Sequence, residues 1–165
     1  MKTTTTTRSK TNLRASYFAL LLATLTMAFA PQRAWATGKV PFKGSAEGAV
    51  VSASPGPAGV LLTVLAEGEA THLGQFSREE VLLLDPSTGT VAGTIVFTAA
   101  NGDQLTGTVA GQFTSPTAVA GTYTFTGGTG RFQNASGEAD FSLSTPDGVH
   151  FTVEFDGSLS SAGAH

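Results

Sequence analysis

From about residue 37 onward, the chain consists of short apolar or alternating segments separated by turn-forming residues, without a long run at helical spacing. Successive side chains of a strand point to opposite faces, so period-two alternation bounded by glycine and proline predicts antiparallel β-structure throughout. We expect nine segments, of which the third and fourth can form one bent strand. They are 43–53, 59–67, 69–76, 80–84, 90–99, 103–113, 120–126, 136–144 and 148–160.

The residues between these segments favour tight turns. Asn101 and Gly102 predict a two-residue hairpin, in which both central residues need positive φ angles. The stretches 85–89 and 145–148 each combine a proline, whose φ is fixed, with a glycine that can close a turn in the left-handed conformation. Ser77 followed by Glu80 is also typical of a helix N-terminus. We favour a strand there because the apolar run that follows is short and ends in a turn.

Alternation in the later segments indicates which face is buried. Aromatic residues Tyr123, Phe125, Phe141, Phe151 and Phe155 share one face, whereas Thr122, Thr124, Asp140, Glu154 and Asp156 lie on the other. Such a sheet must cover its apolar face, either by packing against a second sheet or by closing on itself, and closure also removes exposed edges. We therefore expect an all-β fold, a single antiparallel eight-stranded closed barrel over residues 37–165. Its interior is either packed or holds one small ligand.

The first 36 residues have the form of a secretory signal peptide. Four basic residues precede a near-continuous apolar stretch at 15–30. This stretch is shorter than a membrane-spanning helix, and Ala34–Ala36 then follows with the small-x-small pattern that signal peptidase cleaves. We therefore expect cleavage after Ala36, a secreted or periplasmic protein, and no membrane insertion after processing.

The remaining domain is strongly acidic. Cleavage removes five of the nine basic residues and none of the twelve acidic ones, so four basic residues remain and the net charge is about −8. Such a surface repels phosphate backbones and anionic lipids, which argues against nucleic-acid binding and peripheral membrane attachment. Residues 37–165 also contain no Cys, Met or Trp. Thiol catalysis, thiolate metal sites and disulfides are therefore excluded for this part of the chain.

One segment resembles a known family. Residues 127–139, GGTGRFQNASGEA, are similar to the GGTG-x-F-x-x-A-x-G-x-A segment of plant dirigent proteins and, more loosely, to the glycine-rich turn of allene oxide cyclases. Stretches 70–74 and 97–103 also resemble segments of exported bacterial barrels. The resemblance implies the eight-stranded barrel that these families share, with Phe132 and Ala135 closing one end. It also implies an interior that binds a hydrophobic or phenolic molecule and steers its cyclisation or coupling without a metal or organic cofactor. The pocket acids and arginine of the dirigent family do not align onto this chain, so no catalytic residue is carried over.

Candidate site residues are those that we expect to face the interior. The expected lining is His72, Phe76, Tyr123, Phe125, Phe141, Phe151 and Phe155, and the candidate pocket charges are Arg131 and Arg78. His72 is included because regular alternation places it on the same face as Phe76. Each arginine has the alternative of a surface ion pair. Glu67 and Glu69 are expected in solvent, and the three histidines lack metal-ligand spacing, so we expect no metal site.

Three classes of function remain. They are an exported barrel that binds a small apolar or phenolic molecule, a cofactor-free cyclase or dirigent-like enzyme, and a structural extracellular protein without a ligand. Hydrolases with a nucleophile elbow and P-loop proteins are excluded because neither motif occurs. An open interior would favour binding or catalysis, and a buried acid or histidine would favour the enzyme. An interior filled by phenylalanine would favour the structural protein. The sequence indicates no oligomeric state.

Overall fold

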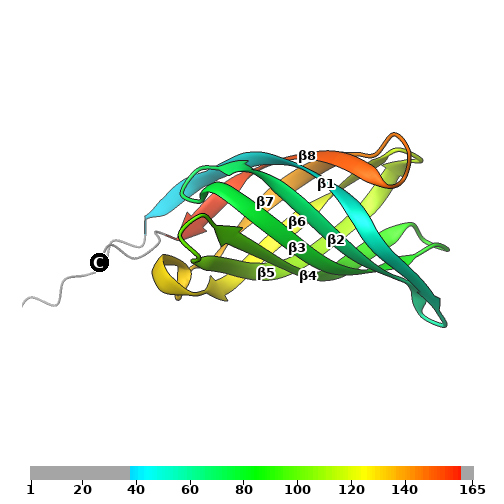
Figure 1. Cartoon of the computed structure of the whole chain (residues 1–165), viewed down its shortest axis with the longest axis horizontal. Helices are drawn as coiled ribbons and strands as arrows, with labels where there is room; N and C mark the ends of the chain where they lie inside the picture. The colour runs from blue at the N-terminus through cyan, green and yellow to red at the C-terminus, as the bar shows by residue number, and fades with distance from the viewer. Residues whose placement is uncertain (1–37, 161–165) are drawn as a thin grey trace, which may run out of the picture. The chain divides into compact units, whose positions relative to one another are not determined.

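The computed structural model describes residues 38–160, which form a closed antiparallel barrel (Figure 1). Its strands are β1 (Lys39–Gly56), β2 (Gly59–Ala70), β3 (Gly74–Asp85), β4 (Thr90–Ala99), β5 (Gln104–Ser115), β6 (Ala118–Gly128), β7 (Gly137–Ser144) and β8 (His150–Ser160). Each strand pairs with the next in the chain, and β1 pairs with β8 to close the wall. The predicted fold class is confirmed. Within residues 38–160 no helix is long and apolar enough to cross a membrane.

Strand β3 settles the ambiguity at Ser77. The residues around it pair with both β2 and β4, so no helix begins there, and the two expected segments at 69–76 and 80–84 belong largely to one strand. The start of that strand was predicted wrongly. Strand β2 extends to Ala70, and residues 71–73 form the turn that leads into β3. His72 lies in this turn with a left-handed φ of 66°.

The turns at 85–89 and 145–148 have the predicted left-handed glycines, Gly89 with φ 71° and Gly148 with φ 74°. The predicted two-residue hairpin at Asn101 is wrong. Four residues connect β4 to β5, and of the central pair only Gly102 has a positive φ, of 86°. The side chain of Asn101 instead accepts a hydrogen bond of 3.2 Å from the backbone N–H of Asp103, which stabilises a longer turn.

Alternate residues of each strand face the interior. The predicted inward residues Tyr123, Phe125, Phe141, Phe151 and Phe155 are all buried. On the opposite face Thr124, Asp140, Glu154 and Asp156 are exposed, and the half-buried Thr122 donates a hydrogen bond of 2.8 Å to Asp140. The inward and outward faces derived from the alternation are therefore confirmed.

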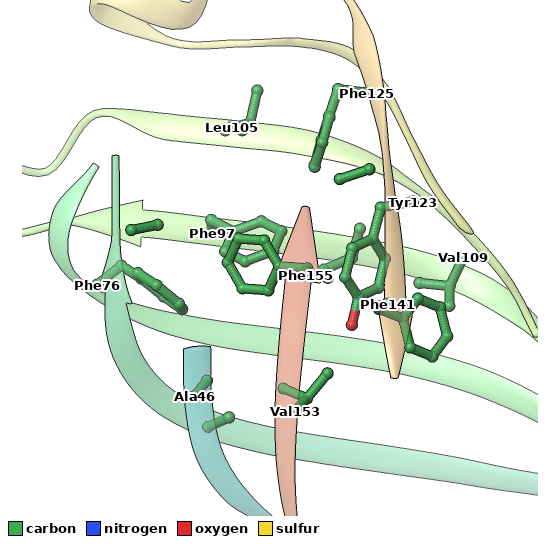
Figure 2. Packing of buried hydrophobic residues seen from close by; sticks show 14 of the residues in the cluster. Ala46, Phe76, Phe97, Leu105, Val109, Tyr123, Phe125, Phe141, Val153 and Phe155 are labelled. Atoms are coloured by element: carbon green, nitrogen blue, oxygen red, sulfur yellow. The ribbon is translucent and has the colours of Figure 1, made fainter. Parts of the chain in front are cut away.

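Aromatic rings fill much of the interior (Figure 2). Phe97 of β4 lies at the centre of this packing, and its ring centroid is 5.1 to 6.1 Å from those of Phe42, Phe76, Tyr123, Phe125 and Phe155. Most of these contacts are edge-to-face, the arrangement that aromatic quadrupoles favour. This part of the interior is a solid core.

The two ends of the barrel differ. At one end, on the left in Figure 1, the short 3₁₀ turn η1 (Gly130–Phe132) follows β6, and Phe132 and Ala135 are buried. We call this the η1 end. At the opposite end, where the turns after β1, β3, β5 and β7 lie, Val91 and Val119 are buried but several other inward side chains are only half-buried. These are Val50, Leu62, Leu84, Phe113 and Leu143.

Candidate functional site

A polar cluster lies inside the barrel among the aromatic rings. The inward positions of β3 are occupied in turn by Phe76, Arg78, Glu80 and Leu82, because the strand alternates without interruption. Arg78 is 2% exposed and Glu80 is 3% exposed. Charged residues are almost never this deeply buried unless they are paired, so these two residues distinguish the interior from an ordinary apolar core.

The cluster is only partly hydrogen-bonded. Nη1 of Arg78 donates a hydrogen bond of 3.0 Å to the hydroxyl of Tyr123, whereas Nη2 lies 3.5 Å from Oε2 of Glu80. The guanidinium is 5.5 to 6.0 Å from the ring centroids of Phe97, Tyr123 and Phe151. Nε of Arg78 and Oε1 of Glu80 are buried without a hydrogen-bond partner. Buried polar atoms are seldom left unpaired, so this pair of atoms indicates a site that another group could complete.

Burial changes the protonation of the cluster. It raises the pKa of Glu80 above its ordinary value, and the attraction of Arg78 offsets only part of that effect. Burial likewise raises the pKa of Tyr123, which keeps its phenol protonated. Arginine stays charged under these conditions. The cluster can therefore donate hydrogen bonds from Arg78, and from Glu80 when that carboxyl is protonated.

Six of the predicted lining residues lie in the interior. Phe76, Tyr123, Phe125, Phe141, Phe151 and Phe155 are each 5% exposed or less. Tyr123 and Phe141 are stacked with their centroids 4.4 Å apart, and the ring of Tyr123 also lies beside that of Phe155 (Figure 2). Arg78, a candidate pocket charge, lies among them and does not form the alternative surface ion pair. That these residues bind a ligand stays a prediction.

Two other candidates lie elsewhere. The expectation that His72 lines the interior is wrong, because the residue is exposed in the turn between β2 and β3 and not in a regular strand. Arg131 is half-buried on η1, where it donates a hydrogen bond of 3.3 Å to the carbonyl of Leu73 and lies 3.7 Å from a carboxylate oxygen of Asp103. It therefore ties η1 to neighbouring turns at the end of the barrel and is not part of the interior cluster.

Three residues that shape this site were not singled out from the sequence. Phe42 and Phe97 are fully buried, and Glu80 completes the charged pair. Period-two counting along an uninterrupted strand from Phe76 would have placed Glu80 inward. The signal was hidden because residues 81–84 are all apolar and do not alternate.

The hollows on the barrel lie mainly on its outer wall, and only the broader one borders the cluster. One is lined by Lys43, Asp140, Asp156 and their neighbours, and a broader one by outward residues such as Glu67, although it also borders Arg78. Most of the lining side chains point outward, so both hollows belong mainly to the outer wall. No group of three or more potential ligands is arranged to hold a metal ion within the part of the chain that the structure describes.

Comparison with known proteins shows the fold. No protein-family model matches the chain, and no curated protein matches it in sequence. Among solved structures, the pterocarpan synthase dirigent protein GePTS1 is similar with a TM-score of 0.60 and 14% identity, over 83% of this chain and 98% of that one. The pterocarpan synthase dirigent protein PsPTS1 is similar with a TM-score of 0.52 and 14% identity, over 77% and 97%. The chain therefore has a dirigent-like eight-stranded barrel with a buried aromatic cluster.

Proposed function

We propose that this protein is an exported barrel that binds one small apolar or phenolic molecule in its interior. The observation that carries the proposal is the cluster of Arg78, Glu80 and Tyr123, in which two buried polar atoms lack a partner. A buried ion pair is rarely a net source of stability, and an apolar replacement of similar volume is often at least as stable. Its presence among aromatic rings is therefore better explained by ligand recognition than by folding.

The two ends of the barrel support different roles. The rings around Phe97 and the η1 end form a packed scaffold, which is the part that a structural protein would need. At the opposite end the inward side chains, such as Leu84 and Phe113, are half-buried and have fewer atoms to hold them in place. We infer that the ligand enters from that end and reaches the charged pair from the side of Glu80.

A second candidate is a cofactor-free enzyme, and Glu80 is the residue that favours it. A carboxyl whose pKa is raised by burial can act as a general acid near neutral pH. The likeness to two synthases is compatible with this candidate but shows the fold alone. If Glu80 transfers a proton, Glu80→Gln should abolish turnover of a bound substrate while leaving its binding nearly intact.

Binding is tested with N-phenyl-1-naphthylamine, a neutral apolar probe whose fluorescence rises in apolar surroundings. We expect saturable binding of one probe per chain. Leu84→Trp, which enlarges an inward side chain, should weaken binding about tenfold or abolish it. Leu83→Trp is the matched control, because the side chain of Leu83, next to Leu84 in the strand, is 39% exposed on the outer wall.

The two leucines separate interior binding from adhesion to the outer wall, where Leu61, Leu65, Val81 and Leu83 are exposed. Probe that binds to this outer surface should respond to Leu83→Trp at least as strongly as to Leu84→Trp. That result, or the lack of any saturable binding by the unmodified protein, would overturn the proposed function.

A further inference from the structure

The guanidinium of Arg78 has more hydrogen-bond donors than the side chains around it accept from. Arg78 has five N–H donors, but its only side-chain acceptors are the Tyr123 hydroxyl at 3.0 Å and one Glu80 oxygen at 3.5 Å. No other charged or titratable side chain faces the interior from any strand within residues 38–160. Nε of Arg78 and Oε1 of Glu80 both lack a hydrogen-bond partner, so no hydrogen bond joins them. A group that pairs with the free N–H donors of Arg78 must bring acceptors such as oxygen atoms.

Burial shifts the charge balance of the cluster in the same direction. The guanidinium remains positive, whereas burial favours the neutral form of the Glu80 carboxyl. The rings of Phe97, Tyr123 and Phe151 stabilise the guanidinium through their electron-rich faces, but they do not neutralise it. An anion would gain this fixed positive charge in surroundings where water does not screen it, whereas a cation would be repelled.

We propose that the barrel interior selects an aromatic monocarboxylate, whose carboxylate accepts hydrogen bonds from the free N–H groups of Arg78. This inference rests on the proposed function and names its ligand class. A carboxylate matches the planar edge of a guanidinium with two parallel hydrogen bonds. When the Glu80 carboxyl beside Nη2 is protonated, it can donate a further hydrogen bond to the same anion. The aromatic part of the ligand packs against rings such as Phe151.

The acidic outer wall does not oppose this selection. Its carboxylates, such as Glu47 and Glu67, are exposed to solvent. Physiological salt screens exposed charges over about 8 Å. The buried guanidinium is not screened in this way, so it determines which charge the interior accepts.

The test compares three ligands of one ring system as competitors of N-phenyl-1-naphthylamine: naphthalene-2-carboxylate, the neutral naphthalene-2-carboxamide, and naphthalene. We expect the carboxylate to displace the probe at about one tenth of the carboxamide concentration or less, because hydrogen bonds to a charged group contribute about 1.5–3 kcal/mol. Naphthalene should be no better than the carboxamide.

A variant that tests the role of Arg78 must replace both charged side chains, so that neither stays buried without its partner. Arg78→Met alone leaves a carboxyl without its partner and endangers folding, whereas Arg78→Met combined with Glu80→Met replaces the pair by apolar side chains of similar length. The double variant should still bind the probe but lose the preference for the carboxylate. Lys43→Met, which removes one positive charge from the exposed outer wall, should keep it.

The outcomes separate this inference from the proposed function. Equal competition by carboxylate and carboxamide, or a preference that survives in the double variant, overturns the inference while interior binding stands. If neither the probe nor naphthalene-2-carboxylate binds, as measured directly by calorimetry, the proposed function and the inference both fall.

Discussion

Replacement of Phe97 by alanine should be among the most destabilising single changes in the barrel. The side chain is fully buried, and rings from β1, β3, β6 and β8 surround it. Neighbours held from four strands cannot collapse far into the space that a phenyl group leaves. We therefore expect the upper part of the range for Phe→Ala in a core, about 4–5 kcal/mol. The domain as a whole is expected to have only about 5–15 kcal/mol of stability.

Phe113→Ala is the matched control, because its ring is half-buried at the opposite end of the barrel. Removal of this ring should lower the free energy of unfolding by only about 1 kcal/mol, because a half-buried ring contributes only part of the stabilisation that full burial of a phenylalanine gives. Guanidinium unfolding followed by far-ultraviolet circular dichroism gives both values by linear extrapolation. A cost below about 1.5 kcal/mol for Phe97→Ala, or equal costs for the two variants, would refute the division of the barrel into a packed part and a loose end.

Two further predictions follow. Burial raises the pKa of Glu80, so the folded protein holds this proton more tightly than the unfolded chain does. The free energy of unfolding therefore falls as the pH rises from the ordinary pKa of 4.5 through the raised value of the folded state. Glu80→Gln should remove that loss, and its free energy of unfolding relative to the parent protein should increase between about pH 4 and pH 8; a difference that is independent of pH would count against a buried, titrating Glu80. If the protein is exported, as we propose, its mature form should begin at Thr37, as judged by its intact mass. A mature protein that retains residues 1–36 would disprove the predicted cleavage.

Much of the barrel follows from period-two alternation alone. The aromatic face of β6, β7 and β8 was predictable because Tyr123, Phe141 and Phe155 alternate with polar residues, whose burial costs free energy. The turns at 85–89 and 145–148 were predictable because proline and glycine restrict the backbone at known turn positions. These are local properties of the chain, so no tertiary information was needed.

The errors occurred where local sequence did not determine the backbone. His72 was placed inward by counting along a strand, but the chain turns there with Gly74 also left-handed at φ 68°, and neither Thr71 nor His72 is a characteristic turn residue. Glu80 was not singled out, because the apolar run that follows it does not alternate. Its burial depends on Arg78 of the same strand and Tyr123 of β6, and the contact with Tyr123 exists only once the barrel has closed.

The pairing of β1 with β8 has a consequence for how the chain can fold. Lys39 lies opposite Ser160, so the seam that closes the barrel joins the two ends of the described chain. Contacts between residues so distant in sequence form late, because the entropy of closing a long loop must be overcome first. Until β8 is available, the strands on either side of the gap retain unpaired edges that can recruit other chains. Loss of the last strand would therefore open the whole barrel to aggregation, whereas a change in a single turn would not.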